Sequence, residues 1–106
     1  MQKPFFVWLK KKLRRIDPEE VMALVTEGNY TKIFLSDQTH CMVRTTLTAA
    51  LKKLPPDMFI RTHRSCAVSI FYINNIEKDC LTIGEHPIPI AKRYYKSVFE
   101  QLNIIE

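Results

Sequence analysis

The chain has 106 residues, which is enough for one domain with a modest core and too few for a second. A hydrophobic content of 46% with 25% charged residues excludes a disordered chain, and no apolar run approaches the roughly 18 residues of a membrane span. The net charge of +5 favours an anionic partner without identifying it.

The beginning of the chain predicts a hairpin. Residues 5–9 are rich in strand-forming residues, and residues 13–16 can form the paired arm. The lysines at residues 10–12 then lie at a charged turn or edge, where they either contact phosphates or remain solvated. Residues 17–20 are typical of a helix start, whereas the apolar residues 21–25 fit a buried strand or a helix equally well.

A second hairpin is predicted over residues 27–44. Gly28 and Asn29 suit a turn because both tolerate positive φ angles. Residues 30–35 form the next strand and residues 40–44 its partner. The two-residue period of a strand places these residues on opposite faces: Tyr30, Lys32 and Phe34 on one, and Thr31, Ile33 and Leu35 on the other.

An internal helix follows, because Thr46 can cap it and Pro55 can end it. Its apolar positions have helical spacing: Leu47, Ala50, Leu51 and Leu54. Strand-like segments then occupy residues 59–61, 67–76, 80–83 and 88–90. A closing helix is predicted because Tyr95, Val98, Phe99 and Leu102 repeat the helical spacing.

The most informative stretch is FIRTHRSCAV at residues 59–68, where three polar side chains lie between two apolar strand-like segments. Arg64 offers a planar fork of donors, His63 a ring donor and Ser65 a hydroxyl, and phosphate oxygens or guanine edges accept from such groups. This stretch resembles the signature of the LytTR family, the DNA-binding domain of bacterial LytR/AlgR-type response regulators, whose pattern is roughly F-x-R-x-H-R-S-aromatic-x-V-N.

The resemblance covers about residues 5–102, so we expect residues 1–106 to form a single LytTR-like domain. It implies a mainly β fold, with antiparallel sheets and hairpins, one internal helix and a C-terminal helix. It also implies that residues 17–20 form a single turn before a strand. The implied function is sequence-specific binding of double-stranded DNA in bacterial transcription regulation, with loops that enter successive major grooves.

Three segments match the contact regions of the family: residues 28–32, 62–65 and 91–93. We expect Arg64 to contact a base or a phosphate, and His63 and Ser65 to contact phosphates. The full set of candidate DNA-binding residues is Asn29, Tyr30, Thr31, Lys32, Arg61, His63, Arg64, Ser65, Lys92 and Arg93.

Ordinary structural roles compete with this interpretation. Arg61 and Arg64 could form ion pairs with carboxylates such as Asp57 or Glu77, and His63 could be a hydrogen-bonded structural residue. Alternating polar residues such as Thr31 and Lys32 are also expected on a half-exposed strand. Lys92 and Arg93 could be solvated at the start of the last helix, although the helix dipole disfavours cations there.

The sequence departs from the family pattern at three positions. Cys66 replaces the usual aromatic residue and Ser69 a common asparagine, and both changes are interpreted as structural. Ala91 stands where a serine is frequent, which removes one candidate phosphate contact.

Other chemistries have little support. No second ligand pair follows His63 and Cys66 at zinc spacing, and only two glycines are available for phosphate or oxyanion loops, so we expect no metal, cofactor or catalysis. The odd number of cysteines and the lack of a recognisable signal peptide predict reduced thiols in a cytoplasmic protein, with no membrane partner.

Two other functions remain open: an interaction domain that has lost DNA binding and uses Phe6 and Trp8 to pack against another chain, and RNA binding. Family resemblance adds two further expectations. One is a receiver domain or sensor, in another chain or in a removed segment, and the other is a weak or DNA-assisted dimer.

Overall fold

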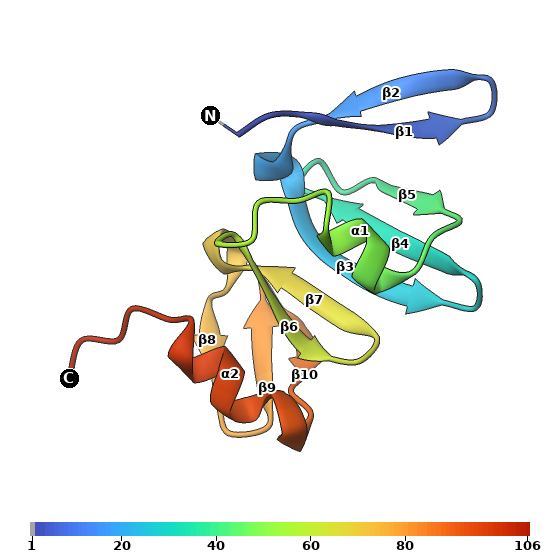
Figure 1. The fold of residues 1–106 in the computed structure, drawn as a ribbon. Coiled ribbons are helices and arrows are strands. Elements are labelled where there is room, and N and C mark those ends of the chain that lie inside the picture. The colour runs from blue at the N-terminus through green and yellow to red at the C-terminus, as the bar shows by residue number, and fades with distance from the viewer. Residues whose placement is uncertain (1) are drawn as a thin grey trace.

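The computed structural model describes residues 2–106, and antiparallel strands dominate it (Figure 1). The strands are β1 (Phe5–Leu9), β2 (Lys12–Ile16), β3 (Val21–Glu27), β4 (Tyr30–Leu35), β5 (His40–Val43), β6 (Phe59–His63), β7 (Cys66–Ser69), β8 (Asn75–Ile76), β9 (Cys80–Ile83) and β10 (His86–Pro89). The helices are α1 (Leu47–Leu51) and α2 (Tyr95–Glu100), and the 3₁₀ turns are η1 (Pro18–Glu20), η2 (Ile70–Tyr72) and η3 (Lys92–Tyr94).

A five-stranded sheet with the order β5-β4-β3-β7-β6 forms the centre of the molecule. Successive residues of β4 alternate as predicted, because Thr31, Ile33 and Leu35 are buried while Lys32 and Phe34 are half-buried on the opposite face. The central sheet is covered on both faces. Its strands therefore contribute apolar side chains to two separate cores.

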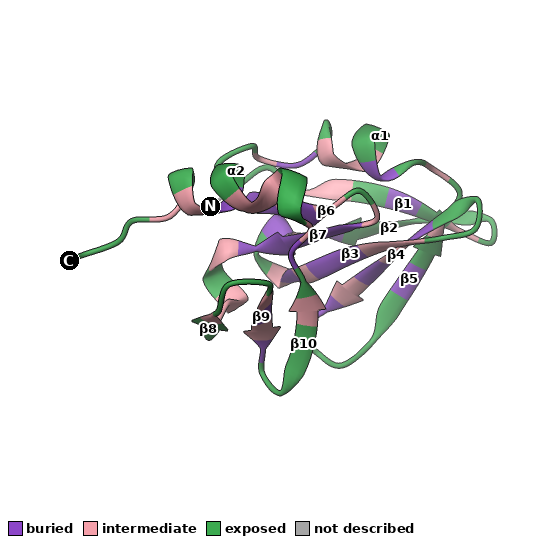
Figure 2. Ribbon diagram, turned by 90° about the horizontal axis from the view of Figure 1, so that it is seen from below, coloured by how far each residue is buried: buried purple, intermediate pink, exposed green. Residues whose placement is uncertain are grey.

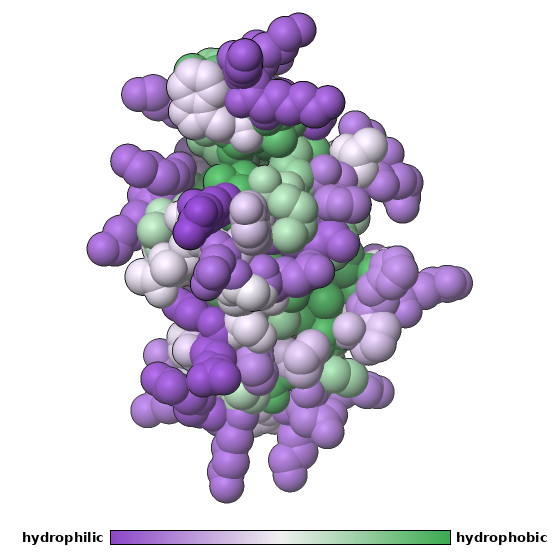
Figure 3. Space-filling model, turned by 90° about the vertical axis from the view of Figure 1, so that its right-hand side faces the viewer, coloured by the Kyte–Doolittle hydropathy of each residue, from purple (hydrophilic) through white to green (hydrophobic). Residues whose placement is uncertain are grey.

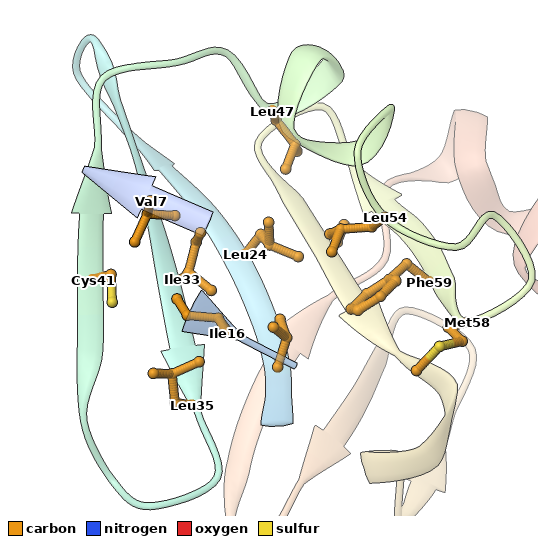
Figure 4. Packing of buried hydrophobic residues seen from close by; sticks show 12 residues of the cluster. Val7, Ile16, Leu24, Ile33, Leu35, Cys41, Leu47, Leu54, Met58 and Phe59 are labelled. Carbon is orange, nitrogen blue, oxygen red and sulfur yellow. The ribbon is translucent and has the colours of Figure 1, made fainter. Parts of the chain in front are cut away.

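The first core lies between one face of the central sheet, the β1–β2 hairpin and α1 (Figure 4). Val7 and Ile16 come from the two arms of the hairpin, and Leu47 comes from α1. The buried members of this core are Val7, Ile16, Val21, Leu24, Ile33, Leu35, Cys41, Leu47, Leu54, Met58, Phe59 and Ala67. Removal of this apolar area from water is the main stabilising contribution on this side.

The second core lies on the opposite face, against the three-stranded sheet β10-β9-β8 and α2. Figure 2 shows the central sheet between α1 above and β9 and β10 below. The buried members are Ala23, Ile60, Val68, Leu81, Ile83, Ile90 and Val98. Val98 is the one fully buried residue of α2 within the described chain, and it fixes this short helix next to β6.

The fold class predicted from the sequence is confirmed, and three local predictions need comment. Residues 18–20 form a single 3₁₀ turn, and β3 follows immediately, as the family resemblance implied. The internal helix ends at Leu51, so Leu54 is buried beyond the helix rather than within it. The segment 67–76 is not one strand, because the Ser69 hydroxyl accepts a hydrogen bond from the Phe71 amide and turns the chain into η2.

All three cysteines are free, as the sequence predicted. Burial raises the pKa of the Cys41 thiol, and a hydrogen bond to Glu77 raises the pKa of the Cys80 thiol. No helix within residues 2–106 has the length and apolar content needed to cross a membrane.

Candidate nucleic-acid interface

Backbone hydrogen bonds join the β6–β7 hairpin to the β3–β4 hairpin and to the segment before η3. The amide of Thr26, at the end of β3, donates to the Ser65 carbonyl at 2.8 Å. The amide of Ala91 donates to the Thr62 carbonyl at 2.7 Å. The β6–β7 turn is therefore bound on one flank to the β3–β4 hairpin and on the other to the segment that enters η3.

The β3–β4 and β6–β7 turns point toward the right-hand side of Figure 1. Figure 3 shows that side of the molecule, where hydrophilic side chains project along its whole length around smaller apolar areas. The loop face, as this surface is called below, comprises the accessible residues of the two turns and of η3, which is joined to β6 through the hydrogen bond of Ala91 to Thr62: Gly28, Asn29, Tyr30, His63, Arg64, Ser65, Lys92 and Arg93.

The β3–β4 turn presents Asn29 and Tyr30 to solvent, and Gly28 makes the reversal possible with a φ of +60°. Thr31 was predicted as a DNA contact, and this prediction is wrong. Its side chain is fully buried, and its hydroxyl donates to the Thr45 carbonyl at 2.9 Å. Lys32 lies on the other face of β4, where its ammonium is 5.2 Å from the centre of the Phe34 ring.

The β6–β7 turn contains an internal hydrogen-bond network. The Ser65 amide donates to His63 Nδ1 at 3.2 Å, and the Ser65 hydroxyl lies 2.9 Å from the same nitrogen. Because Nδ1 accepts from the amide, the neutral ring carries its proton on Nε2, which stays available as a donor. The alternative role of His63 as a hydrogen-bonded structural residue is thus present, and it leaves Nε2 as the remaining donor of the neutral ring. Arg64 is exposed at the tip of the turn.

Arg61 differs from Arg64, because its guanidinium is used within the protein. Nε donates to the His63 carbonyl at 3.4 Å, Nη2 donates to the Arg64 carbonyl, and Nη1 donates to Thr48 Oγ1 at 3.0 Å. Within residues 2–106 the ion pairs are Arg15 with Asp17 and Lys96 with Glu100. Neither Arg61 nor Arg64 therefore pairs with Asp57 or Glu77.

The third segment exposes two cations, Lys92 and Arg93. Both lie in the 3₁₀ turn η3 rather than at the start of the last α-helix, which begins at Tyr95. The Arg93 guanidinium lies 5.1 Å from the centre of the Tyr94 ring, and the Arg61 guanidinium lies 6.0 Å from the same ring. Tyr94 thus connects η3 with the β6–β7 turn.

A hollow of about 260 Å³ opens between the two hairpin turns and the start of α1. No carboxylate is among its described lining residues: Thr26, Gly28, Asn29, Thr45, Thr46, Leu47, Thr48, Arg61 and Arg64. The hydroxyl residues Thr45, Thr46 and Thr48 were not predicted as part of the site. Their clustering directly after β5 was the available signal in the sequence, since Thr46 was recognised there only as a helix cap.

The comparisons with known proteins agree with this architecture. The LytTr DNA-binding domain of a Bacillus cereus protein has a TM-score of 0.82 to this chain at 20% identity, and the match covers 98% of this chain and 100% of that one. The family model described as the LytTr DNA-binding domain matches residues 11–103. The chain belongs to the LytTR family of DNA-binding domains.

Two curated relatives are longer proteins of similar sequence. The sensory transduction protein LytT of Enterococcus faecalis is 30% identical over 96 residues, and that of Bacillus subtilis is 28% identical over 95 residues. Each match covers 84% of this chain and 39% of the relative. The chain thus spans about two fifths of the length of these relatives.

Proposed function

We propose that this domain binds double-stranded DNA sequence-specifically and serves bacterial transcription control, with its loops reading successive major grooves. Membership of the LytTR family supports DNA binding in transcription regulation. The names of the two LytT relatives, both sensory transduction proteins, support a place in a signal-responsive regulator that carries further domains, such as a receiver.

The observation that carries the proposal is that hydrogen bonds join the β6–β7 hairpin to β3 and to the segment before η3, next to exposed cations that have no carboxylate partner in the described chain. Arg64, Lys92 and Arg93 are exposed, and within the described chain none of them forms an ion pair. Binding to DNA needs cations to offset phosphate charge and a few donors aimed at base edges. Both requirements have candidates on the loop face.

The candidate residues have different proposed roles. The guanidinium of Arg64 has the planar fork that fits O6 and N7 of guanine, so it is the proposed base-reading group. His63 and Ser65 on the same turn, and Lys92 and Arg93 on η3, are proposed phosphate contacts. The β3–β4 turn contributes Asn29 and Tyr30 at its exposed tip, with Lys32 behind them. Thr31 is excluded from this set by its burial.

Selection from a pool of random duplexes tests the proposal most directly, because it reports binding and sequence preference together. Fluorescence anisotropy at increasing salt on the selected duplex then gives the number of phosphates contacted. If about six are contacted, log affinity should fall against log salt with a slope near −5. No enrichment, or a flat salt response, would overturn the proposal, and a matched RNA hairpin as competitor tests RNA binding.

A second candidate function, protein interaction, is favoured by the outer face of the β1–β2 hairpin. Phe6, Trp8 and Leu13 are 56%, 65% and 52% exposed, and Trp8 lies directly opposite Leu13 across the hairpin. Exposed apolar groups in one patch often mark a contact surface.

The expected weak or DNA-assisted dimer is tested by analytical ultracentrifugation with and without the selected duplex. A Phe6→Ser variant shows whether this face takes part.

A further inference from the structure

The guanidinium of Arg61 contacts three parts of the structure: the β6–β7 turn, α1 and η3. It donates to the carbonyls of His63 and Arg64 in the turn itself, and to the Thr48 hydroxyl at the start of α1. It also lies 6.0 Å from the ring of Tyr94 in η3. A single side chain thus connects Thr48 with Tyr94, which are 46 positions apart along the sequence.

The turn that Arg61 supports has an irregular register. The pairing of β6 with β7 shifts between Arg61 and His63, so the regular ladder does not extend evenly to the tip. A bulge of this kind leaves backbone groups unpaired and redirects the side chains that follow it. The carbonyls of His63 and Arg64 follow this bulge, and the guanidinium of Arg61 donates to both of them.

We propose that Arg61 is a positioning residue for DNA recognition: it fixes the orientation of the β6–β7 turn and couples it to α1 through Thr48 and to η3 through Tyr94. This inference rests on the proposed function, because it concerns how the reading group Arg64 is held. It revises the prediction that Arg61 is itself a DNA contact. It also brings Thr48 and Tyr94, which the sequence did not single out, into the recognition apparatus.

The chemistry of the fork explains why arginine suits this position. A guanidinium has five N–H donors in a fixed plane, and three of its nitrogens here reach three different acceptors. Lysine would bring the same charge but a single nitrogen, which cannot reach two turn carbonyls and Thr48 in the same way. Arg61→Lys therefore removes the cross-link while keeping the charge.

The first test uses the free protein, so that it does not depend on DNA. Amide hydrogen exchange at Ser65, measured by NMR, should become at least about fivefold faster in Arg61→Lys, because opening of the turn becomes easier. Thr48→Val should also accelerate exchange at Ser65, but by a smaller factor. In a variant with both substitutions the two effects on exchange should be less than additive, because Arg61 and Thr48 belong to one hydrogen-bond network. Arg15→Lys, the same change at an exposed arginine on the β1–β2 hairpin, is the control and should leave Ser65 unaffected. Unchanged exchange in both variants at the site would overturn the proposal.

The second test separates positioning from direct contact, using the selected duplex and a scrambled duplex. Arg61→Lys should weaken specific binding about tenfold and non-specific binding by less than about twofold, so discrimination is lost. A salt titration of Arg61→Gln, which removes the charge, then decides between the two roles. If Arg61 contacts a phosphate, the slope of log affinity against log salt loses about 0.9 in magnitude, whereas a positioning role leaves this slope nearly unchanged. A loss near 0.9 with normal Ser65 exchange would contradict the inference.

The two proposals can fail separately. If the wild-type domain binds no duplex in a salt-dependent manner, the proposed function is wrong whatever Arg61 does. If the wild-type domain binds specifically but Arg61→Lys matches it in both exchange and discrimination, only the positioning role is wrong. Circular dichroism and thermal unfolding of each variant show that the comparison is made between folded proteins.

Discussion

The loop face and the β1–β2 hairpin both carry clustered cations, yet they are built in different ways. On the loop face, backbone hydrogen bonds join the β6–β7 turn to β3 and to the start of η3. The lysines at residues 10–12 are exposed, and their ammonium groups form no ion pair in the described chain. Positive charge alone therefore does not distinguish the two regions. The difference lies in how firmly the donors are held.

This difference has an energetic meaning for recognition. A flexible lysine can reduce the repulsion between phosphates, but it loses conformational entropy when it is fixed against one partner. The backbone of a turn that hydrogen bonds hold has already lost its freedom during folding, so less conformational entropy remains to be lost when the turn meets DNA. We therefore expect the loop face to discriminate between sequences and the hairpin to contribute, at most, charge.

The largest expected effect comes from Arg64→Ala. Loss of a bidentate contact to a base should cost about 1–3 kcal/mol of binding free energy and relax discrimination at one base position. Anisotropy titrations against a panel of single-base substitutions in the selected duplex measure both quantities. Arg15→Ala is the matched control, because it removes a guanidinium that is 66% exposed and already paired with Asp17. Equal losses of DNA affinity in Arg64→Ala and Arg15→Ala would show that the loop face and the β1–β2 hairpin do not differ in DNA recognition.

A change at the helix cap that borders the hollow should have the next largest effect, on stability. The Thr46 hydroxyl accepts a hydrogen bond from the Ala49 amide at 3.0 Å. Thr46→Ala should therefore lower the free energy of unfolding by about 1 kcal/mol, measured by urea denaturation, while Thr46→Ser should retain most of it. A loss in the serine variant as large as in the alanine variant would show that the hydroxyl is not responsible.

A smaller effect is expected for Lys92→Ala. A lost phosphate contact should lower affinity for all duplexes alike and reduce the magnitude of the salt slope by about 0.9. Lys96→Ala offers a charge-matched comparison in α2, since Lys96 is 91% exposed and lies 4.0 Å from Glu100. If the loss depends on the base sequence, Lys92 reads bases and the proposed division of roles is wrong.

Much of the fold could be predicted from local patterns, and one error at the site could have been avoided. The alternation in residues 30–35 already placed Thr31 on the face opposite Lys32, together with Ile33 and Leu35. Thr31 and Lys32 therefore could not both point toward the same partner. Burial of Thr31 follows from the same period that predicted the strand.

The remaining differences depend on contacts between distant segments. Local spacing extended the internal helix to Leu54, but the helix ends at Leu51 and Leu54 is buried by packing in the first core. The contacts of Arg61 depend on the meeting of α1, β6 and η3, which no local pattern encodes. The resemblance to a family identified the polar turn, while the structure distinguishes the arginine that supports it from the arginine that it presents.

The smallest effect on DNA binding is expected at the outer face of the β1–β2 hairpin. A test there shows most directly whether the hairpin and the loop face differ in function. Trp8 is the single tryptophan of the chain and is 65% exposed, so its fluorescence reports on this face alone. Its emission should not change when the selected duplex is added, and Trp8→Ser should alter DNA affinity by less than about twofold and stability by less than about 0.5 kcal/mol. A change of emission on binding, reversed by high salt, would place the hairpin within the DNA footprint. An emission change that appears instead with a receiver domain or a second copy of the chain would assign this face to protein contact. Because each partner gives a different response from one side chain, the experiment decides what the exposed aromatic residues of the hairpin contact.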